Sequence, residues 1–136
     1  MEDLIIWDDS YSIGFEILDN QHKELVAMTN ELFQCCKQGG AVADTALAGT
    51  ISKALEYAQI HFYTEEKYMK LADYPNLGPH KKEHENFVAQ VRSTIEEYDQ
   101  GRAEPIILVR FLKDWLINHI ALVDKQCIPY FAKLQG

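Results

Sequence analysis

Seven metal-capable side chains on the apolar faces of predicted helices constrain this 136-residue chain more than any other feature. They are His22, His61, Glu65, His80, His84, His119 and Asp124, and they include every histidine in the sequence. Burying so many imidazoles and carboxylates without partners would cost several kcal/mol or more. A domain of this length has only roughly 5–15 kcal/mol of net stability. A metal centre would satisfy all seven groups together, so the sequence predicts one in the core.

The predicted core consists of amphipathic helices that follow an N-terminal arm, residues 1–18. The first helix is predicted to begin near Asp19, a favourable N-cap, and to stop at Gly39-Gly40. The second is predicted to open near Asp44. It is predicted to end at residues 73–79, where prolines disfavour a helical backbone.

Two further helices complete the prediction. The third carries His80 and His84 and is expected to end near Gly101. The fourth opens at Pro105, a residue suited to the first helical position, and Pro129 is predicted to end it. No segment has the pattern of a strand. The fold class is therefore all-α, an up-down-up-down four-helix bundle with an N-terminal arm, and residues 1–136 are expected to form a single domain.

The composition narrows the possible functions. The sequence has 13 Lys+Arg against 21 Asp+Glu, a formal net charge of -8, whereas nucleic-acid binding needs a basic face. No apolar run approaches the roughly 20 residues that span a bilayer, and the acidic N-terminus does not resemble an export signal. Three cysteines, two of them adjacent, make a poor disulfide framework. We therefore expect a cytoplasmic protein with no nucleic-acid partner and no membrane insertion.

The spacing of the seven residues supports a shared site. His61 and Glu65 are four residues apart, so they project about 40° apart on successive turns of one helix. His80 and His84 repeat this spacing on the next helix. Each piece alone has an ordinary explanation: an inward histidine such as His22 is usually a hydrogen-bonded core residue, and His-x-x-x-Glu occurs on many solvated helix surfaces. Only the joint pattern indicates a metal.

The donor set narrows the choice of metal. Structural zinc takes four ligands in a closed tetrahedron, and one zinc ion cannot use seven. Iron–sulfur clusters require cysteine spacings that this sequence lacks, and haem would use only one or two of the seven groups. Five imidazoles with two carboxylates able to bridge suit a pair of first-row transition ions, with iron preferred and manganese second.

The ordered set, together with the flanking sequences His61-Phe62 and Trp115-Leu116-Ile117-Asn118-His119-Ile120, resembles the hemerythrin family in its single-domain bacterial form, bacteriohemerythrin. The resemblance implies two Fe ions per chain, joined by an oxo or hydroxo bridge. It also implies the division of the ligands: His80, His84 and His119 on one iron, His22 and His61 on the other, and Glu65 and Asp124 bridging both. The two-histidine iron then has one open position, where O2 would bind.

The same resemblance implies reversible O2 binding, for transport, storage or scavenging, with O2 as the partner and no delivery partner identified. Trp115, Leu116, Ile120 and Phe62 match the apolar O2 pocket of the family, although ordinary core packing explains their spacing equally well. The Lys81-Lys82-Glu83 run is most simply a solvated face.

No enzymatic activity is predicted, because all five histidines are assigned to the metal and no further histidine remains to act as a general acid or base near the oxygen. Two other functions stay open. The chain could be an O2-sensing or redox-sensing domain of a signalling protein, or it could be a di-iron peroxidase or iron-handling protein.

The last two residues of the set raise a geometric difficulty. His119 and Asp124 are five residues apart, about 140° around a regular helix, so they cannot share one face. We therefore predict a π-like turn or a helix end between Ile120 and Cys127. A regular α-helix through this stretch with Asp124 facing the metal would contradict the reasoning.

Overall fold

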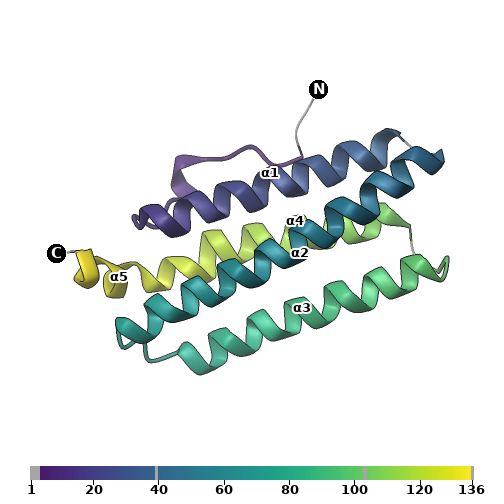
Figure 1. The fold of residues 1–136 in the computed structure, drawn as a ribbon. Coiled ribbons are helices and arrows are strands. Elements are labelled where there is room, and N and C mark those ends of the chain that lie inside the picture. Colours follow the sequence, from purple (N-terminus) through teal and green to yellow (C-terminus); the bar gives the residue numbers. More distant parts are fainter. Residues whose placement is uncertain (1–3, 39, 103, 136) are drawn as a thin grey trace.

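The computed structural model describes residues 4–38, 40–102 and 104–135, and in these ranges four long helices run alternately up and down (Figure 1). They are α1 (Glu16–Gln38), α2 (Gly40–Leu71), α3 (Leu77–Asp99) and α4 (Pro105–Asn118). Helices α2 and α4 each pack against both α1 and α3, which closes the bundle. A short α5 (Ile128–Gln135) ends the described chain. No strand occurs in these ranges, and the predicted all-α bundle is confirmed.

The first two helices begin earlier than predicted. Helix α1 begins at Glu16 rather than near Asp19, because the Asp19 carboxylate serves the arm instead of the helix end. It accepts hydrogen bonds from Ser12 Oγ at 2.7 Å and from the Ile13 amide at 2.8 Å. Helix α2 begins at Gly40, whereas the prediction put its start near Asp44. Of the predicted Gly39-Gly40 stop, Gly39 lies outside the described residues.

The prolines behave differently from one another. Pro105 opens α4 as predicted. Helix α3 ends at Asp99, and Gly101 adopts a left-handed φ of 74° just after it. The prediction that Pro129 ends the helical segment is wrong, since Pro129 is the second residue of α5. A proline is tolerated there because the first amides of a helix have no partner within it.

The apolar core has two parts, one on each side of the predicted ligands. The larger part includes Leu25, Phe62 and Ile120, and the smaller includes Leu18, Met69, Cys127 and others. Along α1, His22 lies between Leu18 and Leu25, and along α2 Glu65 lies between Phe62 and Met69. The polar residues therefore form a layer across an otherwise apolar bundle. No helix in the described part of the chain is long and apolar enough to cross a membrane.

The described part of the N-terminal arm before α1, residues 4–15, lies along α1 (Figure 1). Besides the hydrogen bonds to Asp19, the arm is attached by a pair of hydrogen bonds with the Asn30 side chain. The Ile5 amide donates to Asn30 Oδ1 at 2.8 Å, and Asn30 Nδ2 donates to the Ile5 carbonyl at 2.8 Å. The Ile5 side chain is buried in the larger core.

Replacing Asn30 with alanine removes both hydrogen bonds and leaves the part-buried amide and carbonyl of Ile5 without these partners. We expect N30A to lower the free energy of unfolding by about 1–3 kcal/mol in urea denaturation, at roughly 0.5–1.5 kcal/mol per hydrogen bond. The matched control is E31A, which truncates an exposed neighbour on α1. If N30A and E31A lowered the free energy of unfolding equally, the hydrogen bonds of Asn30 to the arm would contribute nothing to stability.

Candidate metal centre

The structure brings all seven predicted ligand residues together in the middle of the bundle. Helix α1 supplies His22, α2 supplies His61 and Glu65, α3 supplies His80 and His84, and the segment after α4 supplies His119 and Asp124. Every one of these residues is buried, the most exposed being His80 at 4%. The interior therefore holds five imidazoles and two carboxylates away from solvent.

A π-helical turn solves the geometric difficulty of the last pair. Residues His119–Val123 form this turn, and the Asp124 amide donates to the His119 carbonyl, five residues back. The wider turn brings Asp124 onto the same face as His119, where Asp124 Oδ1 lies 3.0 Å from His119 Nε2. The chain then tightens into a 3-10 helix, Asp124–Cys127. The predicted irregularity between Ile120 and Cys127 is confirmed.

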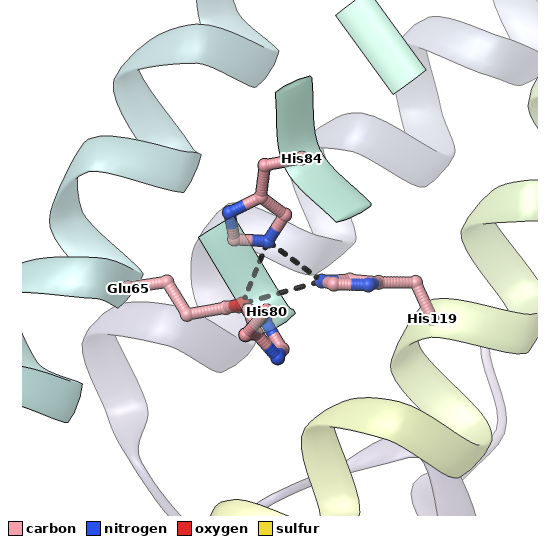
Figure 2. A group of neighbouring side chains, drawn as sticks. All are labelled: Glu65, His80, His84 and His119. Carbon is pink, nitrogen blue, oxygen red and sulfur yellow. Dashed lines mark hydrogen bonds and ion pairs between the residues drawn. The ribbon is translucent and has the colours of Figure 1, made fainter. Parts of the chain in front are cut away.

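The donor atoms form two groups that could each hold a metal ion. One is Glu65, His80, His84 and His119, and the other is His22, His61, Glu65 and Asp124. Within each group the donor atoms lie within 4.8 Å of one another. Figure 2 shows the side chains of the first group converging from α2, α3 and the segment after α4. Within this group His84 Nε2 lies 3.2 Å from His119 Nε2.

Glu65 divides its two oxygens between the groups. Oε1 lies 3.1 Å from His84 Nε2 and 3.2 Å from His119 Nε2. Oε2 lies 3.2 Å from His61 Nε2 and 3.6 Å from His22 Nε2. A carboxylate held this way can place one oxygen on each of two ions.

Asp124 divides its oxygens in the same way. Oδ1 approaches His119 and also His80, 3.4 Å from His80 Nε2, and Oδ2 lies 2.9 Å from His22 Nε2. Both carboxylates therefore lie between the same two sets of imidazoles.

Several of these buried atoms lack a hydrogen-bond partner within the described residues. They are His22 Nδ1 and Nε2, His61 Nε2, Glu65 Oε2, His119 Nδ1, and Asp124 Oδ1 and Oδ2. The 2.9 Å approach of His22 Nε2 to Asp124 Oδ2 thus lacks the geometry of a hydrogen bond. Nitrogen and oxygen donors without partners, aimed at common points in a dry interior, fit a pair of first-row transition ions.

The buried histidines and the two buried carboxylates shift one another's pKa values. Burial acts to lower the pKa of His22, but the Asp124 and Glu65 carboxylates offset it and raise that pKa to about 9. Burial also acts to lower the pKa of His80, but the same two carboxylates offset it and raise that pKa to about 9. The pKa of His61 is lowered by burial. Burial acts to raise the pKa of both Glu65 and Asp124, yet the neighbouring histidines hold both below the usual values.

Three polar residues outside the predicted set contact histidines that belong to it. Gln21 Oε1 lies 2.7 Å from His61 Nδ1, Glu66 Oε2 lies 2.8 Å from His84 Nδ1, and Glu83 Oε1 lies 3.7 Å from His119 Nδ1. Sequence reasoning did not find them. Lys81 and Lys82 are exposed, as the predicted solvated face requires, whereas Glu83 is partly buried, with its side chain 38% exposed, and lies beside His119. The available signal was adjacency: each of the three is next to a ligand in sequence.

An apolar cavity of about 30 Å³ lies beside the site, and its wall includes Phe62, Trp115 and Leu116. Ile120, the fourth residue of the predicted O2 pocket, is fully buried but does not belong to this wall. The Phe62 ring stacks on His84 with a centroid distance of 3.9 Å, and Trp115 stacks on His119 at 4.4 Å. Sequence reasoning did not identify the rest of the wall, namely Leu25, Thr29, Leu32, Ile51, Ala54, Leu55, Ala58, Phe87, Val91 and Leu112.

The cavity offers almost nothing to which water could bind. Thr29 carries the one hydroxyl in the wall, and its Oγ1 donates to the Leu25 carbonyl at 2.8 Å. A buried water needs about two to four polar partners, and apolar cavities without them stay dry. The space is therefore suited to a small apolar molecule.

Comparison with known proteins decides the family. The model of the hemerythrin HHE cation binding domain matches residues 13–131. The chain belongs to the hemerythrin family. The predicted resemblance is confirmed.

Relatives in the hemerythrin family match over most of their length. Myohemerythrin of Sipunculus nudus is 30% identical over 122 residues, which are 90% of this chain and 89% of that protein. Bacteriohemerythrin of Clostridium acetobutylicum is 30% identical over 128 residues, 92% of this chain and 99% of that protein. A solved structure of wild-type hemerythrin, 28% identical, matches with a TM-score of 0.86 and covers 95% of this chain and 98% of that chain. Membership supports O2 binding at a non-haem di-iron site and does not favour the sensing or peroxidase functions.

Metal uptake by the metal-free protein at pH 7 is expected to release protons. His22 and His80, each with a pKa of about 9, are largely protonated at that pH, and a metal ion binds only neutral imidazole. Apparent affinity for Co2+ or Fe2+ therefore rises as the pH rises toward 9 and levels off above it. Calorimetric titration in two buffers of different ionisation enthalpy measures the protons released, with metal-loaded protein as the control. Uptake without proton release would contradict the charge assignment.

Proposed function

We propose that this protein binds O2 reversibly at a non-haem di-iron centre, as a carrier, store or scavenger rather than as an enzyme. The observation that carries the proposal is the division of each buried carboxylate between two sets of imidazoles. A single metal ion would leave one set without a partner. Two ions give every donor in both sets a bond.

The ligands proposed for one iron are His80, His84 and His119, and those for the other are His22 and His61. Glu65 and Asp124 are proposed to bridge the pair. When bound, the iron pair supplies two electrons and a free coordination position for O2. The two-histidine ion has one imidazole fewer from the protein, so the free position is assigned to that ion.

The cavity wall is proposed to keep water away from bound O2. Phe62, Trp115 and Leu116 present hydrocarbon surface next to the ligand histidines, and the Thr29 hydroxyl is already satisfied by the backbone. Ile120 is proposed to support this pocket from the adjoining core, where it is fully buried. Excluding water limits the exchange of protons and the loss of charged oxygen species from a low-dielectric site.

The remaining properties agree with a small O2-binding protein. We propose that residues 1–136 act as one hemerythrin-like domain in the cytoplasm, where the free cysteines Cys35, Cys36 and Cys127 stay reduced. The acidic net charge of -8 argues against a nucleic-acid partner. O2 is the one partner proposed.

Repeated cycles of reduction, O2 exposure and O2 removal test the proposal. We expect about two irons per chain and a visible absorption band that appears with O2 and disappears when O2 is removed. Metal analysis and anaerobic spectroscopy on the reconstituted protein measure both. A single tightly bound zinc, or a colour that forms once and never reverses, would contradict O2 binding of this kind.

The division of the ligands predicts the effect of removing one imidazole. We expect H22A to lose the two-histidine iron first and to retain about one iron per chain without reversible O2 binding, because that ion keeps a single histidine. The matched control is N20A, an exposed position in the same turn of α1. Equal loss of both irons from H22A would contradict the proposed division.

A further inference from the structure

The ligand histidines differ in what lies behind them. Each presents Nε2 to the centre, so Nδ1 is the atom that faces outward. Behind His84 and His119, in the three-histidine group, lie the carboxylates of Glu66 and Glu83. Behind His61, in the two-histidine group, lies the neutral amide of Gln21.

The other histidine of the two-histidine group adds no charge either. His22 Nδ1 is buried without a hydrogen-bond partner in the described residues. Among the residues that the structure describes, the outer contacts at Nδ1 therefore place negative charge behind the three-histidine group and none behind the two-histidine group. This asymmetry lies outside the seven ligands, which divide their carboxylate oxygens evenly.

Glu66 makes the stronger of the two charged contacts. Its Oε2 lies 2.8 Å from His84 Nδ1, within hydrogen-bond distance, whereas Glu83 lies 3.7 Å from its histidine. The His84 side chain is 3% exposed and that of Glu66 is 23% exposed. A charge beside a buried ring is less screened than a surface charge, so its effect reaches the ligand nitrogen.

We propose that Glu66 is a positioning residue that makes the three-histidine iron the more readily oxidised member of the pair, while Gln21 leaves the other iron less so. This inference rests on the proposed di-iron function. A carboxylate that accepts a hydrogen bond from Nδ1–H fixes Nε2 as the ligating atom and increases its electron donation. Extra donation stabilises the ferric ion more than the ferrous ion, because the ferric ion carries the larger charge.

Two neighbouring glutamates make a controlled experiment possible. Glu66 and Glu85 line the same open groove between α2 and α3. Glu85 is exposed, and no hydrogen bond or ion pair joins it to the ligand histidines in the described part of the chain. E66Q and E85Q thus remove the same charge from the same groove, and only E66Q changes a histidine contact. The amide oxygen of a glutamine at position 66 can still accept a hydrogen bond from Nδ1–H of His84, so E66Q removes the charge while keeping the hydrogen bond.

The test is a spectroelectrochemical titration of the iron-loaded protein without O2, in which each ferric ion gains one electron from a reduced soluble redox dye. We expect E66Q to lose about tenfold in its preference for ferric over ferrous iron. That loss corresponds to a rise of about 59 mV in the lower of the two midpoint potentials. Q21E, which places a charge behind His61, is expected to lower the upper midpoint. E85Q is expected to leave both midpoints unchanged.

The outcomes separate this inference from the function beneath it. If wild-type protein loads two irons and binds O2 but E66Q shifts no more than E85Q, the inference is overturned and the function stands. If wild-type protein does not load two irons, the proposed di-iron function is contradicted, and the inference that rests on it falls with it. Should E66Q fail to fold, Q21E still decides, because a midpoint that does not fall in that variant also overturns the inference. Iron content and circular dichroism confirm that each variant is intact.

Discussion

The contact of two buried carboxylates with five buried imidazoles is the interaction on which the rest of the structure depends. These groups come from α1, α2, α3 and the segment after α4, so each long helix is tied to a single height in the bundle. Sliding one helix by a turn would separate opposite charges in a low-dielectric interior. The two apolar cores on either side do not have this directional requirement, because hydrophobic contacts tolerate repacking.

Much of the fold and the candidate site could be predicted from the sequence because both depend on local spacing. Helical periodicity predicted the bundle, and the four-residue intervals predicted which side chains share a face. The five-residue interval from His119 to Asp124 was the most informative detail, since it conflicts with a regular helix and the chain resolves the conflict with a π turn. The structure brings the seven predicted residues together, and their binding of iron stays a prediction.

The contacts that the sequence did not predict form between segments that are neighbours only in the folded structure. Glu66 looks like a solvated residue until α3 brings His84 against it, and Glu83 acquires its partner only when the segment after α4 is in place. The N-cap assigned to Asp19 was wrong because the arm folds back and uses the same carboxylate. The cavity wall likewise combines residues from helices that are distant in sequence.

The π turn also governs the end of the chain. The wider turn takes up the fifth residue between His119 and Asp124, so that Cys127 and Phe131 still point into the smaller core, where Phe131 meets Phe15 of the N-terminal arm. A regular α-helix that kept every residue of this stretch would rotate Asp124 and all that follows by about 100°, the angle of one residue, and would turn both the carboxylate and this aromatic contact away from their places. The position of Asp124 among the imidazoles and the docking of the C-terminal segment therefore depend on the same local widening of the backbone.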